Sequence, residues 1–378
     1  MNTHTSGFLA VRQRWPRWVG WACYVLAVFL FIEVSLHVFY RATSGAWYWN
    51  STPSLYVGDE ISGYTNKPNL SFHHVTPEFS VDIFTNSQGF RVSRAHEEYG
   101  YDAAPGTLRI LLLGPSFAYG WGVDYERTFG EQLRQRLTAA RSRGYSEVEV
   151  LNHGVPGLPT ANSLEWFRYK GRAYSPQIVM LFVYGSLDEL EEPAPSPLIT
   201  KVKTVWSYAK LSATIYYMGV LIGIVYRSWH GAEKGQPIEG AGRAMINRSV
   251  FNVDDPRVKE SVRLYTRFRD EVRQAGARLL IMHFPLPYVV HPEDLSRWVL
   301  HGVTNVRQQI QFNRELCSFL VRQGIACLDL TDQLMEAAKH SRERLYYWLD
   351  IHWTERGNVT VAQIVSDYVM KIEIARAH

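Results

Sequence analysis

Five short apolar runs, separated by longer segments of helical character, constrain the fold of this chain more than any other feature. The runs lie at 108–113, 148–151, 178–184, 279–284 and 325–330. Such short, continuously apolar runs are typical of parallel strands that helices cover on both faces. Helices are expected between and after them, at about 126–142, 160–173, 255–275, 304–323 and 354–374. The pattern predicts an α/β fold with a parallel sheet sandwiched by helices.

Composition excludes several classes of protein. Hydrophobic residues make up 46% of the chain and charged residues 20%, which is typical of a folded protein rather than a disordered one. The net charge of +4, without a basic run interleaved with aromatic residues, argues against a nucleic-acid partner. Three cysteines cannot form a disulfide framework or a four-ligand zinc site. We expect Cys317 and Cys327 to be free thiols, with a disulfide between them as the alternative.

The N-terminal region contains a segment that is long enough to cross a membrane. Residues 18–40 are almost entirely apolar and, as a helix, would span roughly 30 Å. Arg12, Arg14 and Arg17 precede the segment, whereas only Arg41 follows it closely. The positive-inside rule then predicts a cytoplasmic N-terminus and an exported remainder. We expect an uncleaved anchor, and a cleaved signal peptide is the competing interpretation.

A second apolar stretch, 211–226, is too short for a typical spanning helix. It lies in a segment, 198–250, with seven Lys or Arg against two Glu. A basic, apolar insertion is suited to an anionic membrane surface, so an interfacial helix is one interpretation. A helix in the core or over the active site is the other.

Four short motifs follow the apolar runs in a fixed order. Ser116 follows the first run in Gly114-Pro115-Ser116, and the second run leads into Asn152-His153-Gly154-Val155-Pro156-Gly157. The third ends in Gly185-Ser186-Leu187-Asp188, and Asp350-Ile351-His352-Trp353 precedes the last helix. Each motif is weak alone. In a parallel sheet, however, the carboxyl ends of the strands share one edge, where ligands bind.

Taken together, these motifs resemble the four sequence blocks of the SGNH/GDSL hydrolases over residues 106–376. The likeness extends to membrane-anchored members of bacterial polysaccharide gene clusters, in which a segment similar to Asn86–Arg91 also precedes the serine block. Proteins of this kind that O-acetylate exopolysaccharides have similar Asp-x-His-Trp segments. The resemblance implies a flavodoxin-like sheet and ester chemistry with no metal and no organic cofactor.

The resemblance also implies roles for individual residues. Ser116 would be the nucleophile, His352 its base and Asp350 the group that orients the imidazole. The backbone amides of Ser116 and Gly157 would form the oxyanion hole. Further candidates for substrate or auxiliary contacts are Asn152, Ser186, Asp188, Tyr119 and Trp121.

Two positions depart from the family pattern. Leu187 stands where the family has an oxyanion-hole Asn, and Pro115 stands where it has an Asp. Losing one oxyanion donor costs roughly 10²- to 10³-fold in rate, and Ser186 or Asn162 are candidate replacements. Three functions therefore remain open. They are an esterase or O-acyltransferase (acetyl) acting on surface or secreted carbohydrate, a catalytically degenerate glycan-binding or scaffold component of a polysaccharide export or modification complex, and a lipid acyl hydrolase.

The expected organisation follows from these features. It comprises a cytoplasmic tail (1–17), a transmembrane anchor (18–40), a small β-rich lead-in (45–105) and an SGNH-like domain (106–376) with an insertion at 190–253. Single-pass attachment to a bacterial inner membrane, with the catalytic domain in the periplasm, is the expected location. The expected partners are an acylated carbohydrate or small ester, the membrane and polysaccharide-assembly membrane proteins.

Overall fold

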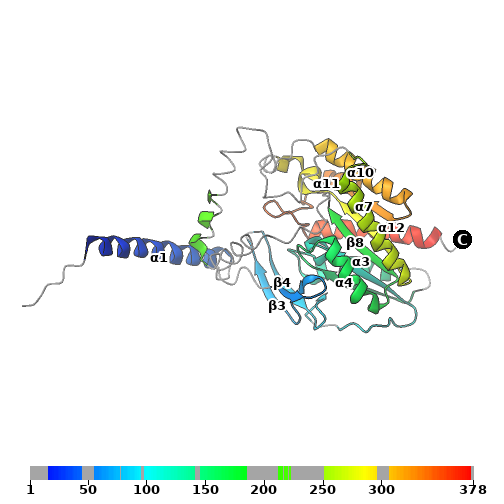
Figure 1. The fold of residues 1–378 in the computed structure, drawn as a ribbon, viewed down its shortest axis with the longest axis horizontal. Helices are drawn as coiled ribbons and strands as arrows, with labels where there is room; N and C mark the ends of the chain where they lie inside the picture. The colour runs from blue at the N-terminus through cyan, green and yellow to red at the C-terminus, as the bar shows by residue number, and fades with distance from the viewer. Residues whose placement is uncertain are drawn as a thin grey trace, which may run out of the picture.

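The fold is described from a computed structural model of the chain (Figure 1). The described residues are 16–44, 55–76, 78–94, 98–140, 145–184, 212–215, 217–219, 221–222, 251–295 and 306–375. Ser186, Leu187 and Asp188 lie outside these ranges, as does most of the expected insertion.

Five parallel strands form the centre of the main sheet. They are β6 (Thr107–Gly114), β7 (Glu147–Gly154), β8 (Ile178–Tyr184), β9 (Arg278–Phe284) and β10 (Ala326–Asp329). Their spatial order is β10-β9-β8-β6-β7, and each adjacent pair is parallel. This is the flavodoxin-like order, in which the first strand lies between the second and the third. The predicted α/β fold with a flavodoxin-like sheet is confirmed.

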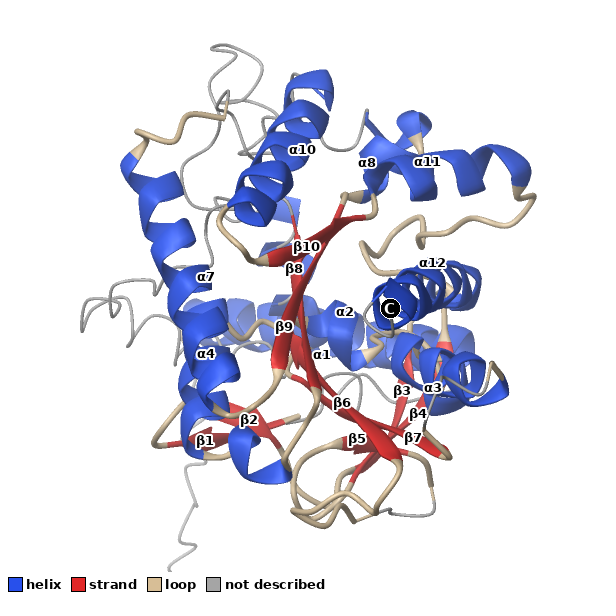
Figure 2. Ribbon diagram, turned by 90° about the vertical axis from the view of Figure 1, so that its right-hand side faces the viewer, coloured by secondary structure: helices blue, strands red, loops and turns tan. Residues whose placement is uncertain are grey.

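Helices cover both faces of this sheet (Figure 2). Residues of β6 alternate between the two faces, so that Leu111 packs with one set of helices and Leu112 with the other. The first set comprises α4 (Thr160–Tyr169), α7 (Pro256–Gln274) and α10 (Val306–Arg322). The second comprises α3 (Phe129–Ala139), α11 (Thr331–His340) and α12 (Glu355–Ala375). Burial on both faces explains why the strands are continuously apolar in sequence.

Five further strands precede the parallel ones. β1 (Tyr56–Asp59) and β2 (Gly63–Asn66) form a separate antiparallel hairpin. β3 (Ser71–Val75), β4 (Ser80–Thr85) and β5 (Arg91–Val92) instead extend the main sheet, in which β5 is antiparallel to β7. Pairing with β5 satisfies backbone groups that β7 would otherwise expose at an edge. The limits proposed for the lead-in and the other domains remain predictions.

Short helices complete the described secondary structure. They are α2 (Ser116–Tyr119), η2 (Tyr125–Arg127), η3 (Gly171–Tyr174), α8 (Pro287–Val290) and η5 (Pro292–Asp294).

The N-terminal apolar segment forms one long helix, α1 (Arg17–Ser44), which projects from the domain (Figure 1). Within the described residues, Arg17–Ala42 is the one helix long and apolar enough to cross a membrane, with a mean hydropathy of 2.1. The described residues of 211–226 are helical from Ala213 onward. Met218, Leu221 and Ile222 are more than half exposed there, so these positions do not belong to the core.

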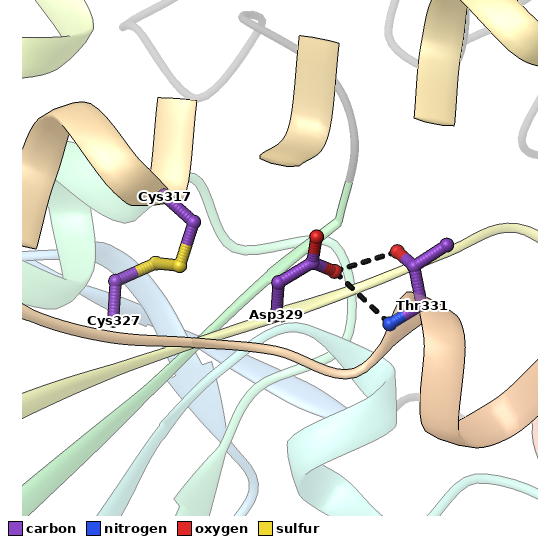
Figure 3. The surroundings of a disulfide bond; sticks show 4 residues. All are labelled: Cys317, Cys327, Asp329 and Thr331. Atoms are coloured by element: carbon purple, nitrogen blue, oxygen red, sulfur yellow. Dashed lines mark hydrogen bonds between the residues drawn. A yellow bond between two sulfur atoms is a disulfide. The ribbon is translucent and has the colours of Figure 1, made fainter. Parts of the chain in front are cut away.

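Cys317 and Cys327 form a disulfide, so the expectation of two free thiols was wrong. Their Cα atoms lie 5.5 Å apart, and the bond joins α10 to β10 (Figure 3). In the same strand, Asp329 accepts hydrogen bonds from the amide and hydroxyl of Thr331, at 3.0 and 2.6 Å. β10 is therefore linked to α10 by the disulfide and to the start of α11 by the hydrogen bonds of Asp329. Disulfides persist in oxidising compartments, which is consistent with export.

Candidate active site

Ser116 begins α2 directly after the turn that ends β6. Gly114 has φ +130°, and a Cβ atom there would lie 2.8 Å from that of Phe182, so glycine is required. Pro115 follows in an extended conformation, and its carbonyl accepts from the amides of Ala118 (3.0 Å) and Tyr119 (3.2 Å). The proline that replaces the family's Asp is thus compatible with the turn, because its missing N–H falls at the helix start.

The motif after β7 packs tightly against this helix. A Cβ atom on Gly154 would lie 2.2 Å from the amide nitrogen of Tyr119. The buried side chain of Asn152 accepts from the amide of Gly154 at 3.0 Å and donates to the carbonyl of Tyr119 at 3.5 Å. Asn152 therefore holds the turn that carries Ser116 in place, with its side chain bonded to backbone groups.

Ser116, His352 and Asp350 lie in one hydrogen-bonded row. His352 Nε2 lies 2.5 Å from Ser116 Oγ, although 236 residues separate them in sequence. His352 Nδ1 is hydrogen-bonded to an Asp350 carboxylate oxygen, which also accepts from the His352 amide at 2.9 Å. This geometry fits a nucleophile, its base and the group that orients the base.

The surroundings of the row favour an ionised Asp350. Burial alone would raise the pKa of this carboxyl, but hydrogen bonds from His352 and Trp121 and the charge of His352 hold the pKa below its ordinary value. The imidazole is enclosed by the rings of Phe117, 4.7 Å away between centroids, and Trp121, 5.8 Å away. A charged Asp350 in this apolar enclosure would stabilise the imidazolium that forms during proton transfer.

Glu78 holds the loop that carries the Asp and His. Its carboxylate accepts hydrogen bonds from three consecutive backbone amides, those of Trp348 (2.7 Å), Leu349 (2.9 Å) and Asp350 (2.7 Å). Glu78 comes from the turn between β3 and β4, more than 270 residues away in sequence. Charge-assisted bonds of this kind are stronger than neutral ones, so the lead-in positions the loop.

His74, on β3, is a second residue near the row that the motifs did not indicate. It is buried between Phe79 and Trp121, at ring-centroid distances of 5.0 and 4.9 Å. Burial lowers its pKa to about 4, while the nearby charge of Asp350 acts in the opposite direction. A neutral imidazole of His74 therefore packs against the ring of Trp121. Within the sequence, the adjacent pair His73-His74 gave no sign of this contact.

Four other predicted residues have contacts outside the row or lie beyond the described residues. Gly157, at φ +77°, sits in the turn after β7, where a Cβ atom would lie 3.3 Å from the Tyr64 hydroxyl. The side-chain amide of Asn162 donates to the carbonyl of Ser62 at 3.1 Å, so it is already engaged. Ser186 and Asp188 lie outside the described residues.

The two aromatic candidates differ in exposure. Tyr119 is 1% exposed beneath the guanidinium of Arg91, which lies 5.0 Å from its ring centroid. Its side chain is therefore part of the core. Trp121 is partly exposed and contacts both His74 and His352, so it is the aromatic side chain at the edge of the site.

Two other features of the described residues bear on where a ligand could bind. Among the described residues, no group of three or more His, Cys, Asp or Glu is arranged to hold a metal ion. A cavity of about 430 Å³ beside α3 and β7 has five carboxylates in its lining, those of Glu98, Glu126, Glu131, Glu147 and Glu149. Two of these are paired, Glu131 with Arg134 and Glu149 with Arg109, both at 2.7 Å. The cavity does not include the Ser116 row.

Comparisons with known proteins agree with the motifs. Residues 247–377 match the family model of the SGNH hydrolase-like domain of the acetyltransferase AlgX. The matched part, about a third of the chain, contains Asp350 and His352 but not Ser116. Among curated proteins, none matches this chain.

Solved structures with a similar fold include esterases. The acetyl xylan esterase AlAXEase is 12% identical, with 69% of this chain and 99% of that one covered, at a TM-score of 0.40. A lipolytic protein of the G-D-S-L family from Veillonella parvula DSM 2008 is also 12% identical (68% and 96%, 0.36). The acetylxylan esterase Axe2 from Geobacillus stearothermophilus, in a catalytic mutant, is 10% identical (68% and 91%, 0.39). Over residues 247–377 the chain is similar to the SGNH hydrolase-like domain of the acetyltransferase AlgX, and its motifs resemble the same type of hydrolase.

Proposed function

We propose that this protein is a serine-dependent ester hydrolase or O-acyltransferase that forms an acyl-enzyme on Ser116. The observation that carries the proposal is the row from Ser116 Oγ through His352 to Asp350. A serine hydroxyl becomes an effective nucleophile when a base within hydrogen-bond distance removes its proton. His352 is at that distance and Asp350 holds its ring.

The reaction has two steps. Ser116 Oγ attacks the carbonyl carbon of the ester while its proton passes to His352 Nε2, and the alcohol oxygen leaves with that proton. Water or a sugar hydroxyl then attacks the acyl-enzyme, giving its proton to His352, which returns it to Ser116 Oγ. The first acceptor gives hydrolysis and the second gives acyl transfer.

The substrate we propose is an acylated, preferably acetylated, carbohydrate at the cell surface. The similarity of residues 247–377 to an acetyltransferase domain supports an acetyl group. α1 supports attachment to a membrane, and the disulfide between Cys317 and Cys327 supports an exported catalytic domain. We place the domain on the periplasmic side of a bacterial inner membrane.

Hydrolysis of p-nitrophenyl acetate by the full chain in detergent micelles tests this function. We expect measurable turnover, with the imidazole of His352 accepting the serine proton. Ser116→Ala should abolish turnover without unfolding the chain. Equal rates for the two proteins would contradict the proposal.

A second function is favoured by one observation. Leu187 replaces an oxyanion donor of the family, and Asn162, one candidate replacement, is engaged by Ser62. A folded chain that binds acetylated glycan but forms no acyl-enzyme would establish a glycan-binding or scaffold role instead.

A further inference from the structure

The outer end of α1 contacts the catalytic domain beside the candidate active site. The Tyr40 hydroxyl, near the end of the apolar stretch, donates to the carbonyl of Val75 at 3.3 Å. Val75 is the last residue of β3 and directly follows His74. Hence α1 contacts the domain at Val75, the residue next to His74, whose side chain packs against Trp121 at the edge of the site.

Two ring contacts lead from this point to the catalytic histidine. His74 packs on Trp121, and Trp121 packs on His352, at centroid distances of 4.9 and 5.8 Å. In Figure 1, β3 and β4 lie at the end of α1, whereas α12, which begins just after His352, runs to the far side of the molecule. The active site therefore lies on the side of the domain that faces the anchor.

The described part of the insertion lies against the same end of α1. The Glu33 carboxylate accepts from the Ser212 hydroxyl (2.8 Å) and from the amides of Ala213 (2.9 Å) and Thr214 (2.8 Å). Carboxylates are favourable at helix N-termini, so these three donors stabilise the charge of Glu33 within an otherwise apolar helix. Glu33 is eleven residues before Ser44, the last residue of α1, or about 16 Å along the helix from its outer end. The insertion helix thus starts within the outer half of the span.

The exposed side chains of this helix are apolar. Met218, Leu221 and Ile222 are 54%, 60% and 63% exposed. Apolar side chains at this depth beside a spanning helix fit the outer leaflet of the bilayer. The surrounding segment 198–250 carries seven basic and two acidic residues, which fits anionic lipid headgroups.

We propose that the active site works at the outer membrane surface on an acyl ester carried by the sugar headgroup of a membrane-embedded amphiphile. This inference rests on the proposed function and on α1 spanning the membrane. Two contacts fix the geometry: Tyr40 holds the site against the bilayer, and Glu33 holds the insertion helix in the leaflet beside it. A substrate in the same leaflet reaches Ser116 at a high effective concentration, whereas a soluble sugar ester has no such advantage.

A spacer that lifts the domain from the membrane tests this placement. A helical insertion of about 18 residues between Thr43 and Ser44 adds roughly 27 Å. The same insertion before Pro16, at the other end of α1, is the matched control. Each full chain is reconstituted in nanodiscs of phosphatidylethanolamine and phosphatidylglycerol. Three probes are compared: an acetylated alkyl glucoside in the bilayer, the same acetylated sugar without its alkyl chain, and p-nitrophenyl acetate.

We expect the natural chain to release acetate from the bilayer glucoside at least about tenfold faster than from the soluble sugar. The outer spacer should remove this preference and leave p-nitrophenyl acetate hydrolysis unchanged, which also reports correct folding. The control spacer should change neither rate.

Equal rates on the two sugar probes, or a preference that survives the outer spacer, would overturn this inference but not the proposed function. Absence of hydrolysis with every probe would overturn the proposed function, and this inference with it. Release of fatty acid from the phospholipids at a comparable rate would assign the site to lipid acyl chains and overturn the sugar-headgroup proposal.

Discussion

Glu78 accepts a hydrogen bond from the backbone amide of Asp350, at 2.7 Å, and so connects the turn between β3 and β4 to the loop that carries Asp350 and His352. Two preceding amides, of Trp348 and Leu349, donate to the same carboxylate. Within the loop, Tyr346 pairs with Trp353 and the Tyr347 amide donates to the His352 carbonyl at 3.0 Å, but residues 348–350 adopt no regular secondary structure. The placement of Asp350 and His352 therefore depends on a residue outside the parallel sheet.

Replacing Glu78 with alanine should lower kcat about 10²-fold and leave KM nearly unchanged. A small displacement of the base from the nucleophile is enough for a loss of this size. Glu78→Gln should recover part of the rate, because its single carbonyl oxygen can still accept from the loop. Steady-state hydrolysis of p-nitrophenyl acetate measures both constants.

The matched control is Glu336→Gln on the exposed surface of α11, which should keep the natural rate. If Glu78→Ala also kept it, the carboxylate would have no positioning role.

His153 should make the folded state sensitive to acid. Burial, with a contribution from the charge of Lys170, lowers its pKa from 6.5 to about 3. Between these values the unfolded chain binds a proton that the folded chain does not, so the free energy of unfolding falls as pH decreases. The slope from this group is at most about 1.4 kcal/mol per pH unit.

His153→Phe keeps a ring to stack on Trp166 but removes the titrating group. The free energy of unfolding of this variant is measured by urea titration between pH about 4.5 and about 6.5. Its slope against pH should be smaller than that of the natural chain by up to about 1.4 kcal/mol per pH unit, which corresponds to one proton. An unchanged slope would mean that His153 does not titrate as its burial implies.

Gly154→Ala should disrupt the contact between β7 and the nucleophile turn. The new Cβ atom would lie 2.2 Å from the Tyr119 amide nitrogen, which forces the two backbones apart. We expect a loss of about 2–3 kcal/mol in stability and a large fall in turnover. Gly58→Ala, where no atom lies within 4 Å, is the control and should behave as the natural chain. Comparable melting temperatures for the two variants would refute this account.

Removing the disulfide should weaken folding without affecting catalysis. The bond closes a short loop, with a sequence separation of 10 between Cys317 and Cys327, which corresponds to about 2–3 kcal/mol of stability. The chain with both residues changed to serine should unfold at lower urea concentration and become insensitive to reductant. Its hydrolysis rate should be unchanged, because β10 lies at the opposite edge of the sheet from β3. A fall in rate would link this edge to the site.

The sequence alone predicted the central part of the fold well. β8 (Ile178–Tyr184) was predicted with its observed limits, because strands buried on both faces stand out as apolar runs. The meeting of Ser116 with His352 was implied by the resemblance of the four motifs to the SGNH/GDSL hydrolases, and the two side chains do meet in the structure.

Other features could not be predicted, because each depends on a contact between segments that are distant in sequence. Glu78 lies in an ordinary turn, and no local pattern indicates that this turn contacts residues 348–350. Glu33 is the one acidic residue of the apolar segment 18–40, and its partners at 212–214 are about 180 positions away. The spacing of Cys317 and Cys327 allowed a bond but did not require one.

The central claim is that Ser116 carries the acyl group. The most direct test is mass spectrometry of the full chain quenched during turnover of p-nitrophenyl acetate, followed by peptide mapping. We expect an acetyl group on the peptide that contains Ser116, and its accumulation in His352→Ala to be strongly reduced, since the base also serves acylation. Absence of label from Ser116 while hydrolysis proceeds, or equal labelling of the Ser116→Ala chain, would contradict the account.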